Sequence, residues 1–291
     1  MADGASSAWS GDSSNCGAPK LIVDAHQHFW TLASGHCTWL HPENAVLYRD
    51  YRPDQLAPLL QAAGVAGTIL VQAAPSDAET EMLLGIAQET DWVLGVVGWA
   101  DIVSPSAPGR IRALARRAKL RGLRPNLPDP DDDAWHLRAA PALAQMSELA
   151  LSFDALARPH HLGALARTAR DHPALAIVID HAANPPLLGD RSVWNGRMRE
   201  LAARSNVVCK VSGLLTQARS ADERRAIPDV VARLVDMFGP QRLLWGSDWP
   251  VLNQASDFAG WLELAQELLR PLGSDGCAQV FGGVARRVYR V

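Results

Sequence analysis

The stretch LIVDAHQHFW, Leu21 to Trp30, is the most informative part of this chain. It joins an apolar run, Leu21–Ala25, to two histidines, His26 and His28, that are separated by one residue. Side chains alternate between the two faces of an extended strand, so both imidazoles are expected on one face. Such a strand can present them to one metal ion or one substrate oxygen. Ordinary core or surface histidines are the alternative interpretation.

From this first strand onward, short apolar runs alternate with stretches of helical period, and Gly, Pro or Asp marks each transition. The predicted strands are Leu21–Ala25, Thr68–Gln72, Val93–Trp99, Leu120–Arg124, Ala150–Ala155, Ala176–Asp180, Val207–Val211 and Leu243–Gly246. The predicted helices are Pro53–Ala63, Asp77–Glu89, Pro108–Ala118, Pro141–Leu149, His160–His172, Val193–Ala203, Ala226–Phe238, Phe258–Leu269 and Ala278–Tyr289.

This alternation predicts an α/β fold, a single (β/α)8 TIM barrel, for which 291 residues are sufficient. Strands such as Ala176–Ile179 are apolar throughout, as in a parallel sheet covered by helices. A doubly wound open sheet is the alternative, but no Gly-x-Gly-x-x-Gly turn follows a strand, and nothing indicates a dinucleotide site. Residues 1–19, rich in Ser, Gly, Ala and Asp, are predicted to be a disordered tail, with the barrel domain at 20–291.

Composition excludes several classes of function. The formal charge of −3 gives no basic surface for nucleic acid, and no apolar run approaches the roughly 20 residues of a membrane helix. The first residues lack the features of a signal peptide, so a cytoplasmic location is expected. The four cysteines, Cys16, Cys37, Cys209 and Cys277, form no Cys-x-x-Cys pair and are predicted to be free thiols.

Polar residues follow the predicted strands at the end where reacting groups lie in a barrel of this kind. In strand order they are His26 and His28, Gln72, Trp99 and Asp101, Arg124 and Asn126, Asp154 with Arg158 and His160 beyond it, Asp180 and His181, Lys210 and Ser212, and Asp248 and Trp249. Random placement would not gather so many at one end. The sequence therefore predicts a site at the carboxyl ends of the strands.

Most of these residues also have a structural interpretation. Asp180 could accept backbone hydrogen bonds where its strand ends. Arg124 could be an ion-pair partner, or a fork for a substrate carboxylate or hydroxyl pair. Lys210 lies in a buried strand, so its ammonium must reach a carboxylate, the substrate or solvent. His160 is more typical of a cap or surface residue than of a ligand, and Trp249 could be a cleft wall or part of the core.

Seven motifs carry a family resemblance: Asp24–Trp30, Val96–Trp99, Arg121–Arg124, Arg158–His160, Ile179–His181, Gly246–Pro250 and Phe281–Gly283. With them the chain resembles the amidohydrolase superfamily from Lys20 to its C-terminus. More narrowly, it resembles the lactone-hydrolysing branch that includes sugar-acid lactonases, of the L-fuconolactonase and L-rhamnono-lactonase types, and pyrone-dicarboxylate lactonase. The motifs are much more specific for the branch than for the substrate.

The resemblance implies that Asp248 acts as general base, or ligates a metal while activating the hydrolytic water. His26, His28 and His181 would surround the reacting carbonyl. They would do so either as ligands of one divalent ion, with zinc the first candidate, or as direct hydrogen-bond donors. In the mononuclear case the expected metal residues are His26, His28 and Asp248. The predicted substrate contacts are Arg124, Lys210, Trp99, Gln72 and Trp249.

Two departures from the family pattern limit these expectations. Strand four offers no lysine that could be carboxylated, and Phe153 and Asp154 stand where a ligating histidine usually falls, so one metal or none is expected. Pro125 and Asn126 follow Arg124, where many sugar-lactonase relatives carry a histidine, so the particular lactone stays open.

The predicted reaction is hydrolysis of a five- or six-membered lactone in carbohydrate catabolism, by water that Asp248 activates while the carbonyl oxygen is stabilised. Decarboxylation or lactone isomerisation on the same scaffold is the alternative, and a non-catalytic sugar-acid-binding protein is a third hypothesis. The missing Gly-x-Ser-x-Gly elbow argues against a serine esterase. A small-molecule lactone is the expected partner, without nucleic acid or membrane, and a homo-oligomer is compatible with the sequence.

Overall fold

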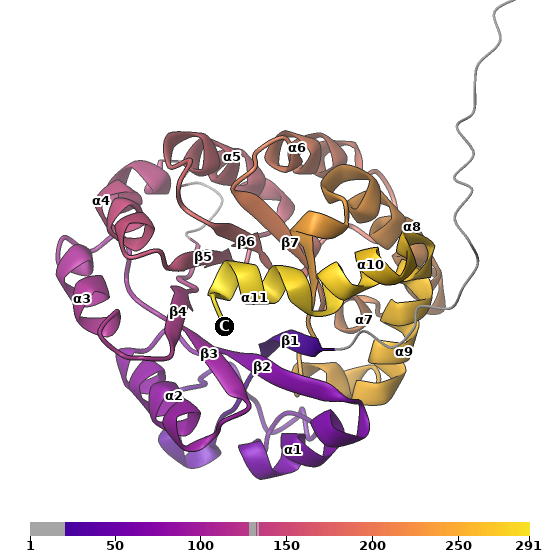
Figure 1. Ribbon diagram of the computed structural model, residues 1–291, viewed down its shortest axis with the longest axis horizontal. Helices are drawn as coiled ribbons and strands as arrows, with labels where there is room; N and C mark the ends of the chain where they lie inside the picture. Colours follow the sequence, from indigo (N-terminus) through magenta and orange to yellow (C-terminus); the bar gives the residue numbers. More distant parts are fainter. Residues whose placement is uncertain (1–20, 128–131, 133) are drawn as a thin grey trace, which may run out of the picture.

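Eight parallel strands follow one another around a barrel in the computed structural model, which describes residues 21–127, 132 and 134–291 (Figure 1). They are β1 (Ile22–Gln27), β2 (Val65–Val71), β3 (Val93–Gly98), β4 (Leu120–Leu123), β5 (Ser152–Ala155), β6 (Ile177–Ile179), β7 (Val207–Val211) and β8 (Leu243–Trp245). Two backbone hydrogen bonds of 2.8 Å join the end of β8 to β1. The Asp248 amide donates to the His26 carbonyl, and the His28 amide donates to the Trp249 carbonyl. The predicted (β/α)8 barrel and its eight strands are confirmed.

Helices surround the strands (Figure 1). They are α1 (Pro53–Ala62), α2 (Asp77–Glu89), α3 (Ala107–Leu114), α4 (Trp135–Glu148), α5 (Leu162–Asp171), α6 (Ser192–Ala202), α7 (Leu214–Gln217), α8 (Ala221–Phe238), α9 (Phe258–Leu269), α10 (Gly273–Ala278) and α11 (Val284–Tyr289). A π-helical turn, Gln279–Gly283, separates α10 from α11 where one continuous helix was expected.

Two helices, α4 and α8, begin more than one turn earlier than predicted. The prediction started α4 at Pro141, because proline favours the first turn of a helix, but Pro141 lies inside the helix. Trp135, the first residue of α4, is only 1 % exposed, and its burial stabilises the helical turns that precede Pro141. Similarly, α8 begins at Ala221 and contains a proline, since the Ser220 hydroxyl accepts a hydrogen bond from the Glu223 amide and caps the first turn.

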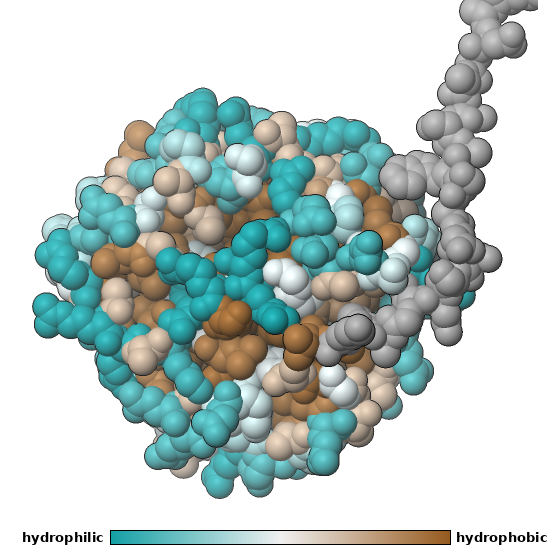
Figure 2. Space-filling model, in the orientation of Figure 1, coloured by the Kyte–Doolittle hydropathy of each residue, from teal (hydrophilic) through white to brown (hydrophobic). Residues whose placement is uncertain are grey.

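The barrel interior is layered. Val178 and Val208 belong to an apolar cluster inside the barrel, and two residues further along the same strands stand Asp180 and Lys210, which are completely buried. Because alternate residues of a strand share a face, the apolar layer lies beneath a charged one. α11 lies across the barrel in Figure 1 and packs Tyr289 into the apolar cluster. A hydrophilic strip crosses the same face in Figure 2.

A bulge in β1 directs the histidines into the barrel. Asp24 and Gln27 are three residues apart but pair with residues only two apart on β2. Ala25 packs inside the barrel, so regular alternation would turn the next side chain outward. The extra residue of the bulge reverses the alternation, so the side chains after Ala25 at positions 26 and 28 point into the barrel. His26 and His28 therefore lie together at the carboxyl end of the strand.

Three remaining expectations concern features outside the site. Cys37 and Cys209 are free thiols as predicted, whereas Cys277 is disulfide-bonded, so the expectation was wrong there; Cys16 lies outside the described residues. The tail at 1–19 and the domain boundary at residue 20 also lie outside them. Within the described ranges, no helix has the length and apolar character needed to cross a bilayer.

Candidate active site

A cavity of about 930 Å³ opens at the carboxyl ends of the strands. Residues that follow seven different strands contribute to its wall, among them His28, Gln72, Arg124, His181 and Asp248. The predicted gathering of polar residues at this end is therefore present.

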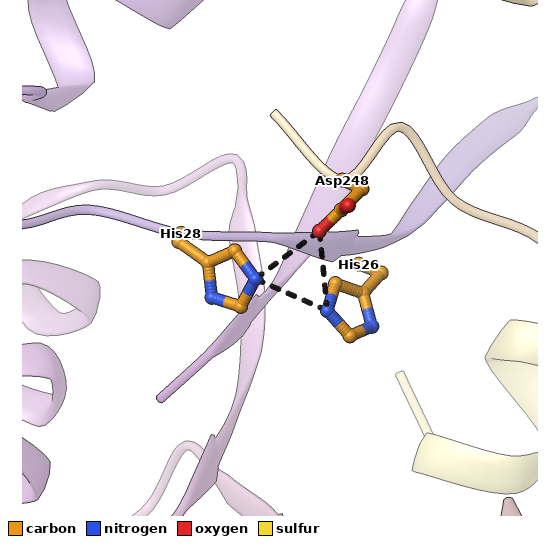
Figure 3. A group of neighbouring side chains, drawn as sticks. All are labelled: His26, His28 and Asp248. Atoms are coloured by element: carbon orange, nitrogen blue, oxygen red, sulfur yellow. Dashed lines mark hydrogen bonds and ion pairs between the residues drawn. The ribbon is translucent and has the colours of Figure 1, made fainter. Parts of the chain in front are cut away.

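His26, His28 and Asp248 form the centre of the site (Figure 3). The two Nε2 atoms are 3.1 Å apart, and Asp248 Oδ1 lies 3.4 Å from His28 Nε2 and 3.8 Å from His26 Nε2. In a tetrahedral zinc site, bonds of about 2.0–2.2 Å place the ligand atoms about 3.3 Å from one another. The spacing of these three atoms therefore fits one divalent ion.

Hydrogen bonds hold the histidine rings in place, and burial disfavours the charged forms of His26 and His28. His28 Nδ1 lies 2.8 Å from the Val71 carbonyl, and His181 Nδ1 lies 2.8 Å from the Ser212 hydroxyl. Burial and then the charge of Lys210 lower the pKa of His26 well below its usual range, and burial also lowers the pKa of His28. Neutral imidazole is the form that ligates metals or donates a single hydrogen bond.

A left-handed turn brings His181 to the centre. Residues 181 to 184 all have positive φ angles, with His181 at 51°, and its Nε2 lies 3.9 Å from Asp248 Oδ1. Gly213 also has a positive φ, and a Cβ there would lie 2.6 Å from His181 Nδ1. The conformation of this turn costs energy for residues other than glycine, so packing around the site must hold it.

Lys210 lies beneath the histidines and is completely buried. Its Nζ is 2.7 Å from Asp154, 2.9 Å from Asp180 and 3.1 Å from His26 Nδ1. Burial would lower the pKa of Lys210, but the two carboxylates outweigh it and raise that pKa. The hydroxyl of Tyr289 donates to Asp154 over 2.6 Å. A charged network thus connects His26 with the far end of the barrel.

Arg124 and Gln72 are joined at the cavity wall. The Gln72 amide donates to the Arg124 carbonyl over 2.7 Å, and the Arg124 guanidinium donates to the Gln72 carbonyl. A second guanidinium nitrogen, Nη1, lies 3.4 Å from both His26 Nε2 and Asp180 Oδ2. Arg124 therefore presents positive charge beside the histidines.

The other predicted substrate contacts lie elsewhere. Lys210 is under the site, and Trp249, at 2 % exposure, packs edge-on against Phe29 and Tyr51 in the core. Trp99 is half-buried and does not line the cavity. Their placement gives no support to direct contact between these three residues and a substrate.

Several residues of the cavity wall were not predicted as site residues. Among them are Trp39, Asn184 and Gln217, and the unassigned His160 lines the wall together with His161. Trp39 is 41 % exposed, and its indole donates to the Ala73 carbonyl over 2.8 Å. These residues lie in loops, in a 3-10 turn (Pro159–His161) or in the short helix α7, where no periodic pattern indicates which way a side chain points.

Comparison with known proteins gives consistent results. A family model described as Amidohydrolase matches residues 23–291. An L-fucono-1,5-lactonase of Burkholderia ambifaria is 45% identical over 276 residues, covering 92% of this chain and 95% of that enzyme. Another L-fucono-1,5-lactonase, from Burkholderia multivorans, is 36% identical over 287 residues, with coverages of 92% and 96%. The crystal structure of an amidohydrolase from Burkholderia multivorans with bound zinc has a TM-score of 0.87 at 34% identity, covering 93% of this chain and 99% of that one.

Proposed function

The chain belongs to the amidohydrolase family, and from that premise we propose that it is a lactonase that opens a sugar-acid lactone by hydrolysis. The similarity to two enzymes named L-fucono-1,5-lactonase, over nearly their full length, supports this choice. The observation that carries it is the position of Asp248, whose carboxylate faces three imidazole rings, those of His26, His28 and His181, at the cavity end of the barrel.

We assign Asp248 the role of general base. Its carboxylate takes a proton from water while the water oxygen attacks the lactone carbonyl. The ring C–O bond then breaks, and the departing alkoxide oxygen takes the proton back from Asp248 and becomes the hydroxyl of the hydroxy acid. Arg124 and the histidines would stabilise negative charge on the carbonyl oxygen by hydrogen bonds that are in place before the reaction begins.

His26, His28 and Asp248 would hold a divalent ion, as the spacing of their donor atoms allows. Zinc is our first candidate because a related amidohydrolase structure contains it. When bound, such an ion polarises a carbonyl and makes water more acidic. Two-metal chemistry is not part of the proposal, since Arg124 occupies the position next to His26.

The walls of the cavity fit a hydroxylated substrate. Asn126, Asn184, Thr216 and Gln217 provide neutral donors and acceptors, and Trp39 provides an aromatic face. Hydrogen bonds to neutral groups suit sugar hydroxyls. We therefore place a neutral aldonolactone ahead of a dicarboxylate lactone.

Acid release in a weakly buffered indicator assay tests this function. Purified protein is offered aldonolactones and pyrone- and muconolactone-type lactones, with and without a chelator and with zinc restored. We expect acidification with at least one aldonolactone. Release of carbon dioxide, or product without acid, would replace hydrolysis by decarboxylation or isomerisation.

Asp248→Asn tests the proposed base. General-base catalysis contributes about 10²- to 10⁴-fold, so kcat should fall by roughly 10³ in a protein that stays folded. Asp236→Asn, on the exposed surface of α8, is the matched control and should retain activity. Wild-type turnover in Asp248→Asn would contradict the assignment.

The remaining expectations about the cell stay predictions of the sequence. They are a cytoplasmic location, the absence of nucleic-acid and membrane partners, and a homo-oligomer. Fractionation and light scattering would test them.

A further inference from the structure

A turn of left-handed residues carries His181 to the centre of the site. The φ angles of His181, Ala182, Ala183 and Asn184 are 51°, 53°, 58° and 49°. Residues other than glycine usually adopt this conformation singly, because Cβ then lies close to the following carbonyl oxygen. Each residue of the run adds strain. Contacts with the rest of the protein must therefore hold the turn, and they determine where the imidazole lies.

Hydrogen bonds to its carbonyl groups hold part of the turn. The Trp194 indole of α6 donates to the Ala182 carbonyl over 2.8 Å, and the Gln217 amide of α7 approaches the His181 carbonyl at 3.5 Å. Within the turn, the backbone N–H of Asn184 donates to the same His181 carbonyl over 2.9 Å. These bonds attach the turn to the helices α6 and α7, but not to β5.

The side chain of Asn184 supplies the connection to β5. Its Nδ2 donates to the Ala157 carbonyl over 2.9 Å, across 27 positions of the chain. Ala157 is completely buried and lies just beyond the end of β5. A carbonyl only accepts, so this bond fixes the orientation of the amide. Asparagine is among the residues that best tolerate a positive φ after glycine, and it therefore suits both the backbone and the bond at this position.

The ring of His181 is anchored on the side of β7. Its Nδ1 lies 2.8 Å from the Ser212 hydroxyl, and a Cβ on Gly213 would collide with the ring. On its other side the ring faces Asp248, with Nε2 3.9 Å from Oδ1. A looser turn would shift the backbone that carries this ring. The distance between the imidazole and Asp248 would then change while the barrel stays folded.

We propose that Asn184 is a positioning residue, whose side-chain amide ties the left-handed turn to the end of β5 and so holds His181 beside Asp248. The order of the turn does not depend on any substrate. Its consequence for turnover rests on the proposed function, in which His181 faces the reacting carbonyl group.

Hydrogen exchange followed by mass spectrometry tests the turn in substrate-free protein. The peptide to follow contains residues 181–184. Asn184→Gly removes the side chain and keeps a residue that adopts a positive φ without steric cost. Loss of one hydrogen bond corresponds to about two- to tenfold in an opening equilibrium, so this peptide should exchange faster by that factor. Exchange at the wild-type rate would overturn the proposal.

Asn184→Asp separates loss of the donor from loss of the side chain. Aspartate has the same size and tolerates a positive φ, but its carboxylate cannot donate to the Ala157 carbonyl. Exchange in the turn should therefore be faster here too. If only the glycine variant exchanged faster, backbone flexibility would explain the result and the proposal would fail.

Kinetics with an active lactone test the effect on turnover. A misplacement of about 1 Å near the reacting groups can cost about 10² in rate, so both variants should lower kcat about 10- to 100-fold. Because Asn184 also lines the cavity, KM can change independently. A change confined to KM would make Asn184 a substrate contact alone and would overturn the positioning role.

Asn206→Ala is the matched control. The Asn206 amide also donates to backbone carbonyls, but it directly precedes β7 and so lies at the opposite end of the barrel; its acceptors are Ala169, His172 and Leu175. This variant should lose stability without changing kcat or the exchange of the turn. Equal effects in Asn206→Ala and Asn184→Asp would reduce both to a loss of stability and overturn the proposal.

The outcomes distinguish this inference from the proposed function. If the wild type hydrolyses no lactone, the proposed function fails, while hydrogen exchange still tests whether Asn184 holds the turn. If Asn184→Asp does not fold, exchange and kcat in Asn184→Gly decide the proposal, with Asn206→Ala as reference.

Discussion

Replacing Tyr289 by phenylalanine removes one hydroxyl group from α11 and leaves the ring in place. The ring is completely buried in the apolar cluster of the barrel, and the hydroxyl donates to Asp154 Oδ2 over 2.6 Å. No cavity of significant size forms, so the lost hydrogen bond dominates the effect. A hydrogen bond to a charged group contributes about 1.5–3 kcal/mol net.

The lower end of that range applies here. Asp154 keeps two further partners, the Ser152 hydroxyl and the Lys210 ammonium, each at 2.7 Å. We therefore expect a loss of about 1.5 kcal/mol in the free energy of unfolding. At about 2.1 cal/mol/K per residue, a chain of 291 residues has an unfolding entropy of about 0.6 kcal/mol/K. Tm should fall by about 2.5 °C.

Calorimetry gives Tm, and urea unfolding should show a lower midpoint with an unchanged slope. Tyr48→Phe is the matched control, because Tyr48 is 40 % exposed. A Tyr289→Phe protein as stable as the wild type would refute the reasoning, since the hydroxyl would then make no net contribution to the charged network.

Three further predictions concern the wall of the site and its pH dependence. Gly213→Ala should lower kcat, because the new Cβ displaces His181. The control is Gly239→Ala, which has a similar φ of 64° and open space around it and should lower stability alone. Equal kinetics in the two variants would contradict this account. Burial raises the pKa of Glu79 to about 7, although hydrogen bonds from the Ala73 and Ala74 amides lower it in part. A raised carboxyl pKa gives stability that is present at low pH and lost as the pH rises through about 7, so this group should make the wild type about 1.3 kcal/mol less stable at pH 8 than at pH 6. Glu79→Gln should remove this term from urea unfolding at the two pH values, and an unchanged pH dependence would reject it. Trp39→Ala should raise KM at least about threefold with kcat nearly unchanged, as steady-state kinetics on an active lactone would show; a loss confined to kcat would place Trp39 in the chemical step.

The barrel could be predicted from the sequence because each strand is a short apolar run. A run of this kind can be recognised from a few neighbouring residues, without knowledge of the rest of the fold. It also predicted a common site for His26, His28 and Asp248, and the structure brings these three side chains together at the carboxyl ends of β1 and β8. The capping sequence from Ser220 to Glu223 was a usable signal for the true start of α8.

Other parts of the site have no local signal. The bond between Tyr289 and Asp154 joins residues 135 positions apart, and only the closed barrel brings them together. The bulge in β1 depends on pairing with β2, which the sequence of β1 does not encode by itself. For Lys210 the sequence required a partner but could not choose among a carboxylate, the substrate and solvent. The structure places two carboxylates and an imidazole there.

The layering of the barrel bears on how this enzyme can be redesigned. In the charged layer, Asp154 and Lys210 lie on β5 and β7 and Asp180 directly follows β6, whereas much of the outer cavity wall, including Trp39, Asn126 and Gln217, belongs to segments that connect the strands. Saturation libraries confined to those connections would alter the shape and polarity that an incoming ring meets without disturbing the buried charges. The scaffold thus separates the positions that an incoming ring would meet from those that hold the buried charges.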